Sequence, residues 1–123
     1  MYILSVDTRF SAAHLLRDFP GKCAGLHGHN WKVKVDVTCK KLSETGIAID
    51  FEDLRVIVNE VIVKLDHKNL NELEYFSFQN PSSENIARFI YNELVERLPS
   101  YISMKSVQVW ESDSNSVTYT EEF

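Results

Sequence analysis

The stretch CAGLHGHN, residues 23–30, brings a thiol and two imidazoles together within a few residues. Gly28 separates His27 from His29, so on an extended backbone both rings lie on the same side of the chain. His14, upstream, supplies a third imidazole, and three neutral imidazoles with one open position are the ligands of a catalytic zinc site. Nearby histidines are also common as exposed or hydrogen-bonded residues. The spacing alone therefore leaves both interpretations open.

Cys23 stands four residues ahead of His27. Beside a metal and histidines, a thiol can lose its proton near neutral pH and act as a base or a nucleophile. The same thiol could instead be a fourth zinc ligand, which would make the site structural and closed. Both roles stay open at this point.

Two further positions could carry chemistry. Asp66 and His67, in the stretch LDHKNLN, could form an acid/base imidazole with an orienting carboxylate, although adjacent residues on a helix do not face each other. A simpler interpretation is a helix end with a cation near the negative end of its dipole. Glu111 shares the strand parity of Val107 and Val109, and a carboxylate on an apolar face needs a partner. A planar N–C–N ligand edge could provide one through two hydrogen bonds.

The elements that must position these residues follow from periodicity. Residues 31–40 alternate between apolar and polar side chains, which predicts a strand with one wet face and places Cys39 in the core. Residues 2–10 predict a weaker strand, so the connection 11–30 is a candidate functional loop. The apolar spacing of residues 54–65, with Asp50 as the cap, and of the segment between Pro81 and Pro99 predicts two helices. Residues 47–50, 105–112 and 116–123 predict further strands. The order indicates an α+β fold with an antiparallel sheet and both helices on one face.

Composition narrows the class of protein. A length of 123 residues suits a single domain over residues 1–123, and no segment approaches the roughly 20 apolar residues of a membrane span. A net charge of −5 without a dense Lys/Arg run argues against a nucleic-acid surface. Two cysteines are too few for a disulfide framework, and the opening MYILSVDTRF does not read as a secretory signal. We therefore expect a cytoplasmic protein.

Six motifs then form one pattern along the chain: FSAAH (10–14), CAGLHGHNW (23–31), GIAIDF (46–51), LDHKNLN (65–71), NPSSEN (80–85) and VWES (109–112). In this order they resemble the 6-pyruvoyl-tetrahydropterin synthase family, and most closely its bacterial branch, the 6-carboxytetrahydropterin synthases of queuosine biosynthesis. The resemblance covers nearly the whole chain.

The resemblance implies the tunnelling fold (T-fold), a four-stranded antiparallel sheet with two antiparallel helices on one face. It implies homo-oligomers, usually trimers stacked as hexamers, with active sites between subunits. The histidines at positions 14, 27 and 29 match the family's zinc ligands, and Cys23 matches its catalytic thiol. Asp66 and His67 match its Asp–His pair, and Glu111 matches the glutamate that holds the pterin ring.

The implied reaction converts 7,8-dihydroneopterin triphosphate to 6-carboxy-5,6,7,8-tetrahydropterin, acetaldehyde and triphosphate, with Zn²⁺ as the cofactor. The spacing of Cys23 and His27 matches the bacterial branch. The alternatives are 6-pyruvoyl-tetrahydropterin synthesis and a noncatalytic zinc or pterin-binding protein. The expected partner is the small-molecule pterin triphosphate, with no nucleic acid and no membrane. Four cations near the motifs are candidates for the triphosphate: Arg9, Arg17, Lys22 and Lys68.

Overall fold

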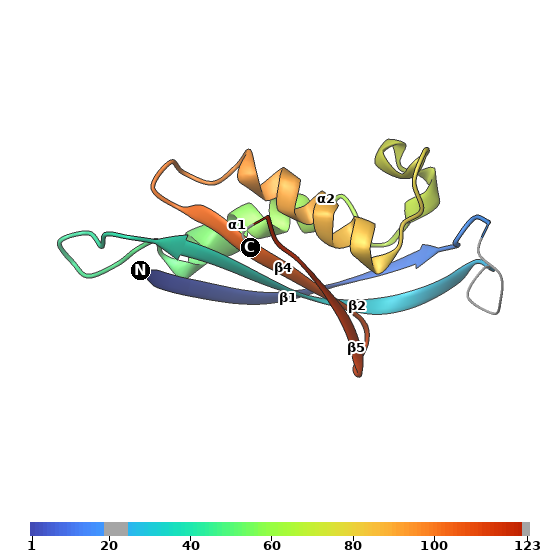
Figure 1. The fold of residues 1–123 in the computed structure, drawn as a ribbon, viewed down its shortest axis with the longest axis horizontal. Coiled ribbons are helices and arrows are strands. Elements are labelled where there is room, and N and C mark those ends of the chain that lie inside the picture. The colour runs from blue at the N-terminus through green and yellow to red at the C-terminus, as the bar shows by residue number, and fades with distance from the viewer. Residues whose placement is uncertain (19–24, 122–123) are drawn as a thin grey trace.

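The computed structural model describes residues 1–18 and 25–121. Two long antiparallel strands, β1 (Tyr2–His14) and β2 (His27–Cys39), form the centre of the sheet (Figure 1). Strand β4 (Ser103–Ser112) pairs with β2, and β5 (Asn115–Tyr119) pairs with β4, both antiparallel. A two-residue strand, β3 (Lys68–Asn69), pairs parallel with the end of β1. Within the described residues the sheet order is β3-β1-β2-β4-β5.

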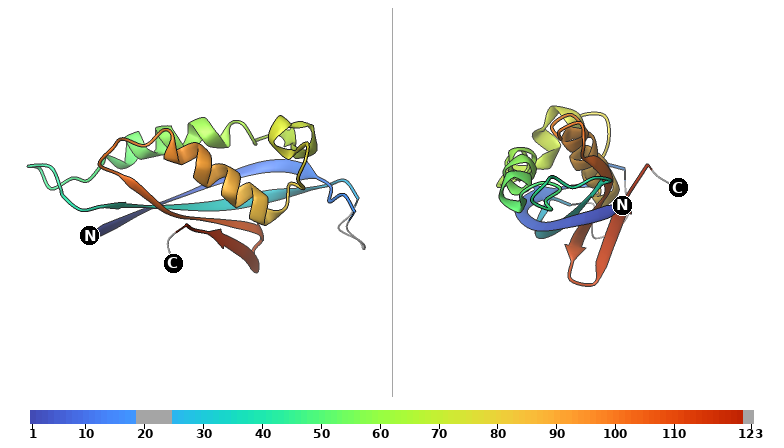
Figure 2. Two further views of the ribbon diagram at one scale, coloured as in Figure 1. Left: turned by 45° about the horizontal axis from the view of Figure 1, so that its top comes forward. Right: turned by 90° about the vertical axis from the view of Figure 1, so that its left-hand side faces the viewer.

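Two helices, α1 (Phe51–Ile62) and α2 (Ser83–Val95), lie side by side on one face of this sheet (Figures 1 and 2). Asp50 caps α1 by accepting from the backbone N–H of Glu52 at 2.7 Å, as the sequence predicts. Ser82 caps α2 by accepting from the N–H of Asn85 at 3.2 Å. Between the helices the chain forms two 3₁₀ turns, η2 (Leu70–Glu72) and η3 (Glu74–Phe76).

The core lies between the sheet and the helices. Alternate strand residues face the helices and are buried, including Val6, Phe10, Trp31, Val33, Val35, Val37, Val107 and Val109. They pack with the apolar stripes of the helices, including Leu54, Val58, Val61, Ile86, Ile90 and Leu94. Cys39 is buried in the same cluster, which confirms the prediction that it is a core residue.

The structure corrects three details of the predicted elements. The ladder of β1 and β2 continues to the pair His14 and His27, so much of the predicted loop 11–30 is strand. Apolar alternation fades there because polar residues occupy both faces, while backbone pairing continues. Residues 47–50 form bends and not a strand. The parallel strand β3 is a fifth strand, absent from the predicted four-stranded antiparallel sheet.

No helix in residues 1–18 and 25–121 is long and apolar enough to cross a membrane.

Candidate metal centre

The three histidines of the sequence pattern meet at one end of the β1–β2 ladder. His14 ends β1, while His27 and His29 begin β2, and His14 pairs directly with His27 in the ladder. All three share the strand parity of the buried residues Phe10 and Trp31, so they face the helices. Each histidine can offer one ring nitrogen to a group that also includes a carboxylate oxygen of Glu111, with all of these atoms within 4.8 Å of one another.

Backbone carbonyls fix the orientation of two of these rings. Nδ1 of His14 lies 2.6 Å from the carbonyl oxygen of Pro81, and Nδ1 of His27 lies 2.6 Å from that of Gly25. A carbonyl only accepts, so each Nδ1 carries the proton and each Nε2 presents a lone pair. The two Nε2 atoms are 3.0 Å apart. Two lone pairs at this distance repel each other unless a metal ion or a proton lies between them.

The donor set fits zinc on chemical grounds. Nitrogens bound to tetrahedral zinc are about 3.3 Å apart, since each Zn–N bond is about 2.0–2.1 Å. The observed 3.0 Å between Nε2 of His14 and Nε2 of His27 is close to that value. Nε2 of His29 is buried and makes no hydrogen bond within the described residues, although it lies 2.9 Å from Oε1 of Glu111. The short contact lacks hydrogen-bond geometry, so this nitrogen is also available to a metal.

Burial favours the neutral form of two of the three imidazoles. Loss of solvent lowers the pKa of His14, against a smaller opposing effect of its hydrogen bond to Pro81. Loss of solvent also lowers the pKa of His29, against the opposing charge of Glu111. Metal binding requires neutral imidazole, so these shifts prepare both rings to act as ligands near pH 7.

Glu111 lies between the cluster and the start of α2. Its Oε1 is next to His29, and its Oε2 accepts from the hydroxyl of Ser83 at 3.3 Å. The N-terminus of α2 at Ser83 carries the positive end of the helix dipole, which favours a carboxylate there. Glu111 can therefore be a fourth metal ligand or an acceptor for N–H groups of a ring that binds beside the metal.

Two asparagines that the sequence analysis did not select hold the chain that follows His14. The side chain of Asn71 accepts from the N–H of Leu15 at 2.8 Å and donates to its carbonyl at 3.0 Å. Asn80 does the same for Arg17, at 2.8 and 2.9 Å. Each amide thus replaces a missing strand partner. Both asparagines stand inside quoted motifs, but the sequence carries no signal for these particular contacts.

The Asp66–His67 pair lies apart from this cluster, at the outer edge of β1. Oδ1 of Asp66 accepts from the N–H of Ser11 at 2.9 Å and lies 3.0 Å from Nδ1 of His67. The hydrogen bond from Ser11 is the main cause of the lowered pKa of Asp66. The backbone of His67 donates to the carbonyl of Ser11 at 2.6 Å. The structure thus brings the carboxylate and the imidazole together although they are adjacent in sequence.

The backbone at His67 is left-handed. His67 has a φ of 58°, which is unusual for a residue with a side chain and marks a position held by its surroundings. Its side chain is 82% exposed. Cys23, the predicted thiol, lies outside the described residues.

Comparisons with known proteins agree with this geometry. The family model for 6-pyruvoyl tetrahydropterin synthase matches residues 3–122. A protein of Archaeoglobus fulgidus with the provisional name 6-carboxy-5,6,7,8-tetrahydropterin synthase is 42% identical over 113 residues, which cover 90% of this chain and 89% of that protein. A 6-pyruvoyl tetrahydrobiopterin synthase of Poecilia reticulata is 35% identical over 135 residues, covering 98% of this chain and 90% of the relative.

The fold has the same relatives. The structure of Caenorhabditis elegans 6-pyruvoyl tetrahydropterin synthase superposes with a TM-score of 0.83 at 28% identity, covering 99% of this chain and 98% of that one. The predicted T-fold is therefore confirmed, with the additional strand β3 noted above. With a match that spans nearly every residue, this chain belongs to the 6-pyruvoyl tetrahydropterin synthase family.

Proposed function

We propose that this protein is a zinc-dependent carbon–carbon lyase that converts 7,8-dihydroneopterin triphosphate to 6-carboxy-5,6,7,8-tetrahydropterin, acetaldehyde and triphosphate. The proposed pathway is queuosine biosynthesis in the cytoplasm. The main support is the convergence of His14, His27 and His29 on one point with Nε2 lone pairs directed inward. The likeness to the Archaeoglobus fulgidus relative favours the carboxypterin reaction.

In this proposal each residue has one task. Zinc held by the three histidines would make the side-chain hydroxyls of the substrate more acidic. Glu111, oriented by Ser83, accepts hydrogen bonds from the N–H groups of the pterin ring. Cys23, as a thiolate, removes a proton from the substrate side chain. His67, oriented by Asp66, moves protons during elimination and carbon–carbon cleavage.

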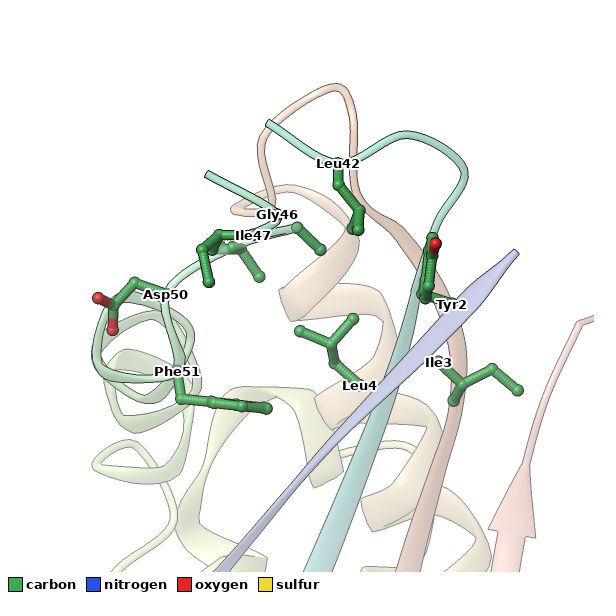
Figure 3. Close-up of a pocket in the computed structure, with 10 residues that line it drawn as sticks. Tyr2, Ile3, Leu4, Leu42, Gly46, Ile47, Asp50 and Phe51 are labelled. Carbon is green, nitrogen blue, oxygen red and sulfur yellow. The ribbon is translucent and has the colours of Figure 1, made fainter. Parts of the chain in front are cut away.

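We further propose that the protein is a homo-oligomer. Within the described residues no strand pairs with the outer edge of β1 before Ala12, and such an edge favours pairing with another chain. The start of this strand, Leu42 and residues 46–51 also surround a hollow of about 380 Å³ (Figure 3). Several apolar side chains around it are exposed: Tyr2, Ile3, Leu42, Ile47 and Phe51. An apolar patch beside an open sheet edge suits contact with a second copy.

The same edge carries Asp66 and His67, so a second copy that pairs there would meet their side chains. In this arrangement the Asp–His pair of one chain serves the metal centre of its neighbour. This assignment gives the exposed imidazole a task that it does not have at the cluster of its own chain.

The decisive experiment identifies the product. The purified zinc-loaded protein is incubated with 7,8-dihydroneopterin triphosphate, the pterin is identified by mass, and acetaldehyde is measured with alcohol dehydrogenase. We expect acetaldehyde to form in step with 6-carboxy-5,6,7,8-tetrahydropterin. Accumulation of 6-pyruvoyl-tetrahydropterin without acetaldehyde would instead support the activity named for the Poecilia reticulata relative.

A noncatalytic zinc protein is the alternative from another class. In that case Cys23 completes a closed shell, and the Cys23→Ala protein loses its metal. In our proposal the same variant keeps its zinc and loses turnover. Metal analysis of this single variant separates the two classes.

A further inference from the structure

Three of the four cations considered for the triphosphate can be judged from their contacts. The guanidinium of Arg17 donates to the carbonyl of Phe76 and, at 2.7 Å, to that of Gln79, so it is occupied within its own chain. Arg9 is exposed and makes no hydrogen bond or ion pair within residues 1–18 and 25–121. Lys68 is exposed on the short strand β3. Lys22 lies outside the described residues.

The two available cations flank His67. One hollow of about 400 Å³ is lined by Arg9, Phe10, Ser11, Asn30, Asp66 and His67. An adjoining hollow of about 370 Å³ shares Ser11, Asn30 and His67 and includes Lys68. Oδ1 of Asn30 accepts from the hydroxyl of Ser11 at 2.7 Å, which leaves the amide N–H groups of Asn30 for a ligand. The region around His67 is thus rich in hydrogen-bond donors.

The chemistry of the proposed reaction places the phosphates in the same region. This step rests on the proposed function, in which His67 moves protons at the three-carbon side chain of the substrate. The triphosphate is joined through an ester oxygen to the last carbon of that side chain, so its first phosphorus is three or four bonds, about 4–5 Å, from the reacting carbons. A cation that binds the first phosphates must therefore lie beside His67.

We propose that Arg9 and Lys68 bind the triphosphate of the substrate on which His67 acts, with the amide of Asn30 as an additional donor. Arg9 and Asn30 have the strand parity opposite to Phe10 and Trp31, so they lie on the face of the sheet away from the three histidines. The phosphates therefore belong to a substrate held mainly by a neighbouring copy.

A third hollow, beyond Arg9, fits phosphate less well. It is lined by Lys32, Trp110 and Asp113 and holds about 120 Å³, against about 400 Å³ for the hollow beside His67. Lys32 lies 4.0 Å from Asp7 and 4.8 Å from the ring centre of Trp110, so its charge is already shared. We therefore assign the triphosphate to the side of Arg9 that faces His67.

The test compares Arg9→Ala, Arg9→Lys and Lys68→Ala with the unchanged protein, all loaded with zinc. Lys34→Ala is the matched control, because Lys34 lies on the same face of β2 but lines none of these hollows. The first readout is KM and kcat with 7,8-dihydroneopterin triphosphate. The second is the affinity for inorganic triphosphate, measured by calorimetry, and the third is the affinity for 7,8-dihydroneopterin, which has no phosphate.

We expect Arg9→Ala and Lys68→Ala to raise KM about tenfold or more, because each removes a charge-assisted contact with phosphate, while kcat changes less. Arg9→Lys should restore part of the affinity because it keeps the charge. The affinity of these variants for 7,8-dihydroneopterin should stay unchanged. In Lys34→Ala, KM, kcat and both affinities should equal those of the unchanged protein. A KM within twofold of the unchanged protein for both alanine variants would overturn the subsite.

The calorimetric measurement separates this inference from the proposed reaction. If the protein turns over no dihydroneopterin triphosphate, an affinity for inorganic triphosphate that falls in Arg9→Ala and Lys68→Ala still supports the subsite. If inorganic triphosphate binds equally to both variants and KM is unchanged, the subsite is wrong although the reaction can stand. Arg9→Ala could also lower the affinity for inorganic triphosphate without changing KM. In that case the triphosphate group of the substrate is not bound at this subsite, and the proposal fails.

Discussion

The histidine cluster and the Asp66–His67 pair are two imidazole sites built in opposite ways. His14, His27 and His29 face the helices, where strands, backbone carbonyls and the start of α2 surround them. His67 lies at a sheet edge with its side chain 82% exposed. The cluster is assembled within one chain, whereas the pair presents its imidazole outward. In the proposed mechanism, metal binding would therefore be a property of the single chain, whereas proton transfer would require a second one.

Removal of a cluster histidine should have the largest effect. His27→Ala and His29→Ala each remove one of three nitrogen donors, so we expect zinc affinity to fall more than about a hundredfold. This loss is larger than the one expected when a residue that only orients a metal ligand is replaced. Metal analysis after dialysis against a chelator measures this, with His67→Ala as the matched control. Full zinc retention by both His27→Ala and His29→Ala would contradict the assignment of the three histidines as metal ligands.

His67→Ala should leave zinc in place and reduce kcat by about a hundredfold to ten-thousandfold, the usual contribution of a general acid or base. A mixture of inactive Cys23→Ala and inactive His67→Ala chains then tests sharing. With random exchange, a half times a half, or about a quarter, of the sites would combine both intact residues. Activity near that level supports shared sites. A fully active monomer would contradict them.

Glu111→Gln distinguishes the two roles of a carboxylate that lies beside the cluster. If Glu111 accepts hydrogen bonds from the pterin, Glu111→Gln should weaken binding of 7,8-dihydroneopterin about tenfold to a hundredfold, because a charged hydrogen bond is lost. Zinc should stay bound. Fluorescence titration with the pterin and metal analysis give both values. Loss of zinc with unchanged pterin binding would instead make Glu111 a metal ligand. The control is Asp113→Asn, a carboxylate on the turn that follows Glu111.

Asn80→Ala should weaken zinc binding by about tenfold, because Asn80 holds Arg17 and precedes Pro81, the acceptor for His14. Asn80→Asp keeps the acceptor for Arg17 and should lie between the two. Competition with a coloured chelator measures the affinity. The control is Asn92→Ala, an exposed residue of α2. Equal zinc affinities for the unchanged protein, Asn80→Ala and Asn80→Asp would show that His14 is positioned without the contacts of Asn80.

The smallest expected effect is on pH-dependent stability of the metal-free protein. Burial lowers the pKa values of His14 and His29, so the unfolded chain binds more protons than the folded chain as the pH falls. The free energy of unfolding should therefore fall as the pH drops below about 6.5, the ordinary histidine pKa. Urea midpoints at about pH 7.5 and 5.5 measure this. His67→Ala, outside the cluster, should show the same difference, and equal midpoints at both pH values would contradict the shift.

Much of the arrangement could be predicted from local pattern. Apolar alternation located the two central strands, Asp50 located the start of the first helix, and Pro81 located the start of the second. The strand ends could not be predicted in this way, because β1 and β2 continue through polar residues such as Ser11 and Asn30. Pairing there depends on the partner strand and not on side-chain polarity. The two-residue strand β3 has no pattern at all, since it exists only through contact with Ala12 and Ala13.

The candidate site divides in the same manner. His-x-His fixes two rings on one side of a strand whatever the rest of the chain does, because successive side chains alternate. The third ring, the carbonyls that orient two of them, and Ser83 beside Glu111 come from segments far apart in sequence. Asn71 and Asn80 were missed because an amide that binds another segment's backbone looks like any polar loop residue in a sequence.

By itself, the sequence determined which residues could do chemistry, the parity of the long strands and the family to which the chain belongs. Only the tertiary structure decided that Asp66 and His67 touch, at a left-handed backbone position where both residues are hydrogen-bonded to Ser11. It also decided that Arg17 is occupied and Arg9 is available. Charge is a property of a residue type, but a free charge depends on which carbonyls and carboxylates the fold brings within reach.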